Sequence, residues 1–201
     1  MIRTLLSLLI LALNVNLAHA IKVGQPAPAF TLTDAGGKAH NLSDYKNKFV
    51  VLEWYNKDCP FVRKHYDSKN MQTLQAAQKK RGVEWLQVIS SAPGLQGYLE
   101  PKEALAQVKK EGATVTATLL DKDGKVGKAY EARTTPHMYV IDKQGTLIYM
   151  GAIDSISSAD TEDVKKATNY VKAALDEALA NKPVTTASTT AYGCSVKYAA
   201  N

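Results

Sequence analysis

Cysteine is scarce in this sequence: the 201 residues include two, Cys59 and Cys194, which lie far apart in the chain. A domain of this size buries a full hydrophobic core, so it does not need disulfide bonds in order to fold. A small, even number of cysteines therefore favours a chemical role. The alternative is one structural bridge that ties down the C-terminal segment.

The sequence also lacks a second long apolar run and a basic stripe. No stretch after residue 20 approaches the roughly 18 apolar residues of a transmembrane helix, so no integral membrane segment is expected there. Lys and Arg outnumber Asp and Glu by 25 to 19, but the two signs are mixed along the chain. Because basic residues are not interleaved with aromatic ones, nucleic acid is not an expected partner.

The first 20 residues have the pattern of a secretory signal peptide. Arg3 provides a basic start, residues 5–13 form a short apolar core, and Ala18-His19-Ala20 is a small-residue cleavage sequence. The sequence therefore predicts an exported protein. A bacterial periplasm is the simplest compartment for it.

Apolar runs between turn residues predict strands, and apolar residues at helical spacing predict helices. The expected strands are 49–55, 83–90, 114–120, 137–142 and 146–151, and the expected helices are 60–80, 101–112 and 160–181. The first of these helices is expected to loosen near residues 68–70, and the chain before the first strand is an expected arm or hairpin. Alternating strands and helices followed by a hairpin and a helix predict an α/β sandwich with a central mixed sheet.

Composition predicts three parts in the chain: the signal peptide at 1–20, one domain at 21–182, and a tail at 183–201. Pro183 is expected to end the last helix. The small, Thr-rich residues that follow predict a flexible tail, and this tail carries Cys194.

Cys59 is expected at the junction between a strand and a helix. Pro60 suits the first position of a helix, where its missing N–H costs nothing. A thiol at this end of a helix is close to unpaired backbone N–H groups, which favour the thiolate. The polar neighbours Asn56, Lys57 and Asp58 predict exposure of Cys59 and therefore reactivity. The alternative is a buried, inert cysteine.

Glu53 lies in the middle of the apolar run, six residues before Cys59. Burial of a carboxyl group raises its pKa, which suits the group to proton exchange. The alternative is that the side chain reaches water or pairs with a lysine.

Three motifs in order carry a resemblance to a known family: GQPAPAFTLTDAGGKAHNL, FVVLEWYNKDCPF and LLDKDGKVGKAYEARTTPHMYVIDKQGTLIYMGAID. The chain resembles the redoxin (AhpC/TSA, TlpA-like) branch of the thioredoxin-like proteins over residues 22–180. The resemblance implies a three-layer α/β/α sandwich with an N-terminal extension and a flexible C-terminal tail. It implies that Cys59 is the attacking cysteine and that Glu53 is a buried acid that moves protons. It also implies that Pro136 is a cis-proline and that Thr135, Pro136 and Pro60 border the substrate.

The chain departs from this family at several motif positions. The second cysteine of CxxC is replaced by Val62, so a disulfide within the motif is excluded. Leu52 and Asn56 stand where peroxiredoxins have Pro and Thr or Ser, and Arg133 does not have the spacing of their active-site arginine. These differences speak against efficient peroxidase activity.

Cys194 is the remaining candidate for the resolving cysteine. The dozen residues that precede it span roughly 20 Å as a flexible chain and about 40 Å when extended. The tail is therefore long enough to bring Cys194 to Cys59 and to close a bridge with it, within one chain or between two. Tyr192 and Tyr198 flank Cys194 and are expected to dock the tail.

No cofactor or metal is expected. Thiol exchange requires no organic cofactor, and the related copper-binding proteins use two closely spaced cysteines, which this chain lacks. His137 is expected to follow the cis-proline near Cys59, where a polar rim histidine is favoured over a ligand. The DKDG sequence at 121–124 lacks the acidic residues that complete a calcium loop, so a turn is expected there.

The sequence thus predicts an exported thiol-disulfide oxidoreductase with Cys59 as nucleophile and Cys194 as resolving cysteine. Its expected partners are protein thiols or disulfides and a thiol reductant. Two alternatives remain open: a thiol-dependent peroxidase, and a non-catalytic thioredoxin-fold binding module whose tail is held by a structural disulfide. The sequence predicts no oligomeric state.

Overall fold

The computed structural model describes residues 21–200, so the predicted signal peptide at 1–20 lies outside the described residues. Its main sheet has seven strands in the order β2-β1-β5-β4-β3-β7-β8. β3 pairs in parallel with β4 and antiparallel with β7, which makes the sheet mixed. The strands are β1 (Thr31–Asp34), β2 (Ala39–Asn41), β3 (Val50–Trp54), β4 (Glu84–Ile89), β5 (Ala117–Leu120), β7 (His137–Ile141) and β8 (Leu147–Gly151).

β3 lies inside the sheet and is buried along its whole length. Val51 and Tyr55 face one core cluster, whereas Val50, Leu52 and Trp54 face the other. A strand buried on both faces explains the unbroken apolar run that predicted it. The chain leaves this strand at the turn that carries Cys59.

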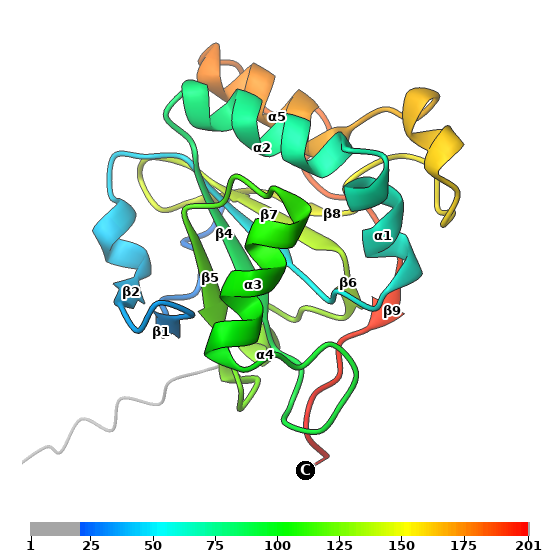
Figure 1. Cartoon of the computed structure of the whole chain (residues 1–201). Coiled ribbons are helices and arrows are strands. Elements are labelled where there is room, and N and C mark those ends of the chain that lie inside the picture. The colour runs from blue at the N-terminus through cyan, green and yellow to red at the C-terminus, as the bar shows by residue number, and fades with distance from the viewer. Residues whose placement is uncertain (1–20, 201) are drawn as a thin grey trace, which may run out of the picture.

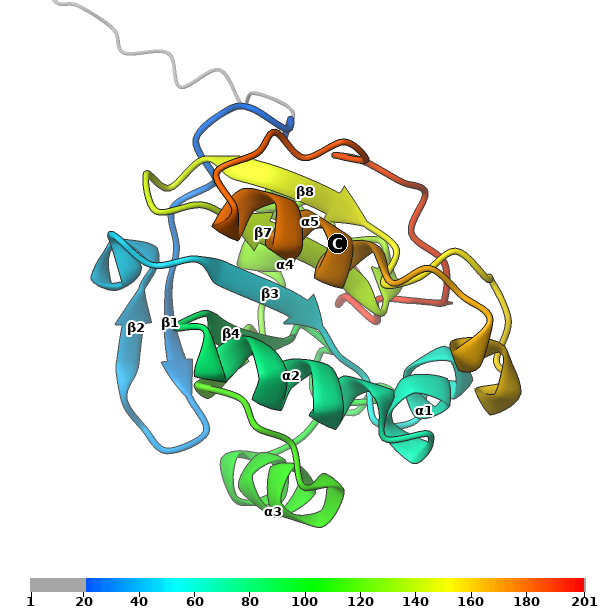
Figure 2. The same cartoon turned by 90° about the horizontal axis from the view of Figure 1, so that it is seen from above.

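Helices cover the two faces of the sheet unequally (Figures 1 and 2). α2 and α5 lie side by side over one face and are joined by an ion pair between Arg81 and Asp176. The opposite face is covered by the short α4 and by the N-terminal arm, whose Phe30 packs against Tyr130. The helices are α1 (Pro60–Asp67), α2 (Asn70–Lys80), α3 (Pro101–Glu111), α4 (Lys125–Ala129) and α5 (Tyr170–Leu179), with 3-10 helices η1 (Leu42–Tyr45) and η2 (Thr161–Lys165).

The α/β sandwich predicted from the sequence is confirmed, with one difference in the last helix. Residues 160–181 form η2 and α5 rather than one helix. The Asn169 side chain accepts a hydrogen bond from the backbone N–H of Lys172 and so caps α5. A capping residue starts a new helix because its own backbone is not helical.

The C-terminal segment, predicted to be a flexible tail, is docked on the domain instead. Its backbone N–H and C=O groups at Ala187 and Thr189 pair with Met150 at the edge of β8. Further on, β9 (Cys194–Ser195) forms a two-stranded antiparallel sheet with β6 (Thr134–Thr135). Figure 1 shows β9 in red beside β6. The expectation of a free linker is therefore corrected, because specific pairing outweighs the flexibility that composition predicts.

Candidate active site

Cys59 is the N-cap residue of α1, and Pro60 occupies the first turn of the helix. The Cys59 carbonyl accepts hydrogen bonds from the backbone N–H groups of Val62 and Arg63 at 3.0 and 2.9 Å. The thiol thus stands at the positive end of the helix dipole, as the sequence predicted. Val62, at the place of the missing second cysteine, is buried in the core below.

The surroundings of Cys59 differ from the prediction in one respect: its side chain is buried rather than exposed. The neighbouring Asn56 is buried too, and its side chain accepts a hydrogen bond from the Asp58 backbone N–H at 2.9 Å. Lys57 pairs with Asp58 at 2.6 Å instead of with the thiol. Polar neighbours therefore shape the turn without exposing the sulfur atom.

The peptide before Pro136 lies against the thiol. Thr135-Pro136 is a cis peptide, as the resemblance implied. The Cys59 Sγ donates a hydrogen bond to the Thr135 carbonyl oxygen at 3.0 Å. Of the three residues predicted to border the substrate, Thr135 and Pro136 are buried at this point and Pro60 is exposed at the start of α1.

Cys194 completes the site from the tail. Its backbone pairs with Thr135 in the β6–β9 sheet, and the carbonyl oxygen of the same Thr135 accepts the hydrogen bond from Cys59 Sγ, so the two cysteines meet at this residue. Both cysteines are free thiols in the structure. The two cysteines of this chain are therefore brought together although the sequence separates them widely.

Electrostatics divides the two thiols into a stronger and a weaker acid. Burial raises the pKa of Cys59. This effect is outweighed by hydrogen bonds with the side chains of Cys194 and Thr135 and with the backbone of Cys194 and Val62, so the pKa of Cys59 is lowered overall. Burial and the adjacent Cys59 raise the pKa of Cys194. Since the thiolate is the reactive form of a cysteine, Cys59 is the more reactive thiol of the two near neutral pH.

Glu53 is fully buried, and its hydrogen-bond partners are neutral. It accepts hydrogen bonds from the Tyr66 hydroxyl at 2.7 Å and from the Trp85 indole N–H at 2.7 Å. Burial raises the pKa of Glu53 to about 7, although these hydrogen bonds oppose the change. This agrees with the predicted desolvation and excludes the alternative of a lysine partner among residues 21–200. The hydrogen bonds described for Glu53 do not include one to Cys59 or Cys194.

We expect Glu53→Gln to remove a pH dependence of stability. The folded protein holds the Glu53 proton more tightly than the unfolded chain, with a pKa of about 7 against an ordinary 4.5. Its contribution to stability is therefore complete below pH 4.5 and is lost as the pH rises through 7, which amounts to roughly 3 kcal/mol. Urea unfolding of both proteins from pH 5 to 8 measures this difference.

The wild-type protein is the reference in that experiment, because the two forms share every other titrating group. These include His65 and His137, whose pKa values burial lowers to about 4. Parallel stability curves for the two proteins would contradict the raised pKa. Thiol-exchange rates of the same variant test whether Glu53 also moves protons in the reaction.

Two further residues considered in the sequence do not join the site. His137 contacts the hydroxyl of Tyr139 at 3.0 Å, and its described contacts do not include Cys59. The Arg133 side chain is exposed and lies 3.8 Å from the Glu131 carboxylate. Within residues 21–200, neither a histidine nor an arginine side chain makes a described contact with the cysteine pair.

The structure contains a buried charged cluster next to the site that the sequence analysis did not predict. Lys64 and His65 of α1 approach Asp154, which follows β8, and the Tyr192 hydroxyl donates a hydrogen bond to this carboxylate. The sequence offered one signal, which is the expectation that Tyr192 docks the tail. Its partners were hidden because they come from two parts of the chain, α1 and the segment after β8, that are both remote from the tail in sequence.

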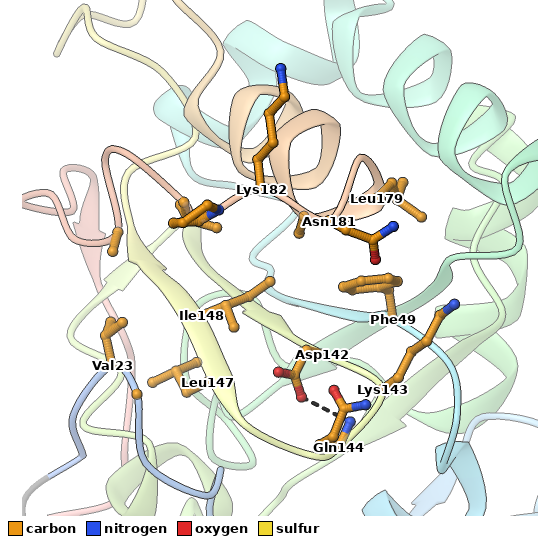
Figure 3. Close-up of a pocket in the computed structure, with 15 residues that line it drawn as sticks. Val23, Phe49, Asp142, Lys143, Gln144, Leu147, Ile148, Leu179, Asn181 and Lys182 are labelled. Carbon is orange, nitrogen blue, oxygen red and sulfur yellow. Dashed lines mark hydrogen bonds between the residues drawn. The ribbon is translucent and has the colours of Figure 1, made fainter.

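The groove shown in Figure 3 lies away from the cysteines. It has a volume of about 420 Å³ and is bordered by the end of α5, the β7–β8 turn and the start of the tail. Asp142, in its wall, accepts hydrogen bonds from the backbone N–H groups of Gln144 and Thr146. Lys143 lies over the ring of Phe49, 5.6 Å from its centre. These polar groups serve the turn itself, so the groove does not add to the chemistry of the site.

Solved structures place the fold among thioredoxin-like proteins. A hypothetical protein from Sinorhizobium meliloti 1021 superposes with a TM-score of 0.76 at 25% identity, over 91% of this chain and 98% of the other. An uncharacterized conserved protein from Geobacillus kaustophilus gives a TM-score of 0.77 at 25% identity, over 90% and 94%. This is the fold of the thioredoxin-like oxidoreductases.

The family follows from the sequence comparisons. The model of the AhpC/TSA family matches residues 23–150, and this chain belongs to that family. The thiol-disulfide oxidoreductase ResA of Geobacillus kaustophilus is 32% identical over 126 residues, which are 63% of this chain and 67% of that protein. A putative peroxiredoxin, ycf42 of Porphyra purpurea, is 27% identical over 79% of this chain and 84% of that protein.

Proposed function

We propose that this chain is an exported thiol-disulfide oxidoreductase in which Cys59 is the nucleophile and Cys194 is the resolving cysteine. The observation that carries the proposal is the pair of free thiols at Thr135, whose carbonyl oxygen accepts a hydrogen bond from Cys59 Sγ and whose backbone pairs with Cys194. Thiols this close can form a disulfide within one chain. The ResA relatives support thiol exchange as the reaction.

The proposed reaction has two exchanges. The Cys59 thiolate attacks one sulfur atom of a substrate disulfide, forms a mixed disulfide and releases the other sulfur as a thiolate. Cys194, as the thiolate, then attacks Cys59 Sγ, and the second substrate sulfur leaves as a thiolate that takes up a proton. The substrate gains two electrons, and the protein ends with a Cys59–Cys194 disulfide. A thiol reductant returns both cysteines to the reduced state.

The site favours this order of attack. The lowered pKa of Cys59 makes it the better nucleophile near neutral pH, and the raised pKa of Cys194 delays the second step. Leu52 and Asn56 do not supply the hydroxyl with which peroxiredoxins activate peroxide. Thiol exchange therefore accounts for the site better than peroxide reduction does.

Cys194→Ser is expected to stop the reaction at the mixed disulfide. With a glutathione disulfide substrate, the variant should retain one glutathione on Cys59, whereas the wild-type protein should form the Cys59–Cys194 disulfide. Non-reducing peptide mass mapping before and after oxidation measures both products. A wild-type protein that keeps glutathione on Cys59 and does not form the internal disulfide would contradict the role of Cys194.

Export is a separate part of the proposal and rests on the N-terminal sequence. Cleavage after Ala20 would leave a mature chain that begins at Ile21, which the intact mass of the protein from the periplasmic fraction of a bacterial host tests. Among residues 21–200, none of the helices has the length and apolar character needed to cross a bilayer. A mass that still includes residues 1–20 would contradict cleavage.

A further inference from the structure

Tyr192, two residues before Cys194 in the tail, contacts the domain through both its hydroxyl and its ring. Its hydroxyl donates a hydrogen bond to Asp154 and accepts one from the Lys64 ammonium group at 3.3 Å. Its ring packs edge-on against Phe61, with centroids 5.8 Å apart. One tyrosine thus combines a polar contact at its tip with an apolar contact along its ring.

The partners of this hydroxyl are themselves buried and charged. Lys64 is 1% exposed and Asp154 is 3% exposed, and their charged atoms lie 3.0 Å apart. A buried ion pair is costly unless hydrogen bonds complete its surroundings. The Ile156 carbonyl accepts one such bond from Lys64 at 2.7 Å, and the Tyr192 hydroxyl donates another to Asp154. The tail therefore completes a polar site that the domain would otherwise leave unfinished.

His65 fits the same arrangement as a neutral side chain. Its Nδ1 is 2.9 Å from the Asn70 amide nitrogen, and its Nε2 is 3.4 Å from the Tyr192 hydroxyl. Since the Asn70 amide donates to Nδ1, the ring carries its proton on Nε2, where it points at the Tyr192 oxygen. The hydroxyl then donates to Asp154 and accepts from Lys64 and His65, and His65 adds no further charge to the cluster.

The position of this cluster links it to the reacting sulfur atoms. Lys64 and His65 belong to α1, the helix that begins at Cys59, and Tyr192 lies two residues before Cys194. Two extended residues span about 7 Å, so fixing Tyr192 on α1 leaves Cys194 little freedom relative to Cys59. A rigid helix thus holds the nucleophile at its first turn and the anchor of the resolving cysteine at its second.

We infer that Tyr192, bound by the Lys64–Asp154 ion pair, is the positioning residue that sets the effective concentration of Cys194 at Cys59. The inference rests on the proposed function and goes beyond it, since it assigns a role to residues that do not touch the substrate. Docking raises the effective concentration above the millimolar range typical of a short flexible linker. Closure of the internal disulfide depends on this gain, whereas the first attack by Cys59 requires the tail to move aside.

Tyr192→Phe tests the inference because it removes the hydroxyl and keeps the ring that packs on Phe61. The measured quantity is the equilibrium constant for oxidation of the protein dithiol by glutathione disulfide, which yields the internal disulfide and two molecules of glutathione. We expect this constant to fall about tenfold or more, as charge-assisted hydrogen bonds of this kind are lost. We also expect the mixed disulfide on Cys59 to persist longer.

Tyr98→Phe is the matched control, because it removes a tyrosine hydroxyl that donates to an exposed carboxylate, Glu100, at 2.7 Å. This variant should behave as the wild-type protein. In a Cys194→Ser background, Tyr192→Phe should also speed alkylation of Cys59, since the loosened tail no longer covers it. Unfolding curves of each variant show that the domain is intact.

The outcomes separate the two proposals. The positioning role would be overturned, and the proposed function left standing, by two equalities: the same oxidation constant for Tyr192→Phe and the wild-type protein, and the same alkylation rate of Cys59 with and without Tyr192→Phe in the Cys194→Ser background. Failure of the wild-type protein to form the Cys59–Cys194 disulfide would overturn the proposed function, and the positioning role would fall with it. A loss of oxidation in Tyr98→Phe as large as in Tyr192→Phe would also count against the inference, because the effect would not be specific to the buried cluster.

Discussion

Replacing Cys59 with serine is expected to slow thiol-disulfide exchange by roughly a thousandfold or more, because it removes the nucleophile itself. A serine hydroxyl ionises far above neutral pH and does not form a disulfide. It still donates a hydrogen bond, so it can replace the thiol in the contact with the Thr135 carbonyl oxygen. The fold should therefore persist. The measurement is the rate of reduction of a model disulfide at pH 7 and 8, with an unfolding curve for each protein.

Cys194→Ser is the control for this experiment. It keeps the Cys59 thiolate and should retain the first attack while losing the second. Exchange that survives in Cys59→Ser would show that another group is the nucleophile. Peroxide consumption measured on the same variants decides the peroxidase alternative, since a peroxidase of this family would lose its activity with Cys59.

Gly193→Ala is expected to detach the tail and to lower the oxidation constant of the cysteine pair by roughly a hundredfold, towards the value of a flexible linker. A Cβ atom on Gly193 would lie 2.1 Å from the Thr135 carbonyl oxygen, which is a backbone collision. The glycine also has a φ of +141°, which side chains rarely adopt. Pairing of β9 with β6 and the alanine side chain are thus incompatible. Equilibration with glutathione buffers measures the loss, and alkylation of Cys59 should become faster.

Gly37→Ala is the control that separates the collision of the new Cβ atom with Thr135 from the backbone strain of alanine at a positive φ. Gly37 has a φ of +90°, but a Cβ atom there would have nothing within 4 Å. This control should lose some stability and keep the oxidation constant of the wild-type protein. If Gly193→Ala kept that constant too, the close passage of the tail along Thr135 would not matter for the chemistry.

The part of the fold that local patterns specify was predictable from the sequence. The apolar run of β3 and the helix after Pro60 are both present, and the predicted loosening near residues 68–70 falls between α1 and α2. Lys69 has a φ of 62° there, which interrupts the helix. These features depend on neighbouring residues and on burial, so a single sequence reveals them.

The last helix shows where periodicity misleads. Apolar residues continue at helical spacing through residues 160–181, which predicted one helix. Asp160 and Asn169 instead cap two separate elements, η2 and α5. A side chain that accepts a hydrogen bond from a nearby backbone N–H favours a helix start over a continuous helix. The spacing of apolar residues does not reveal this preference.

The candidate site was predictable in its residue types and not in its geometry. Cys59, Pro136 and a buried Glu53 follow from motifs, whereas the burial of Cys59 does not. Cys59 lies against Thr135, which pairs with Cys194, and the tail is anchored by Asp154 through Tyr192. These contacts join residues that are remote in the chain. Local composition therefore pointed to a linker where tertiary contacts produce a strand.

The pairing of β9 with β6 has a kinetic consequence. Cys59 has no exposed surface while Cys194 lies against Thr135, so a substrate disulfide reaches the sulfur only after β9 has moved away. The affinity for substrate is reduced by the fraction of molecules in which this opening has occurred. At saturating substrate, the unimolecular opening rate becomes a ceiling on turnover, so the maximal rate for any disulfide should not exceed the rate at which β9 opens.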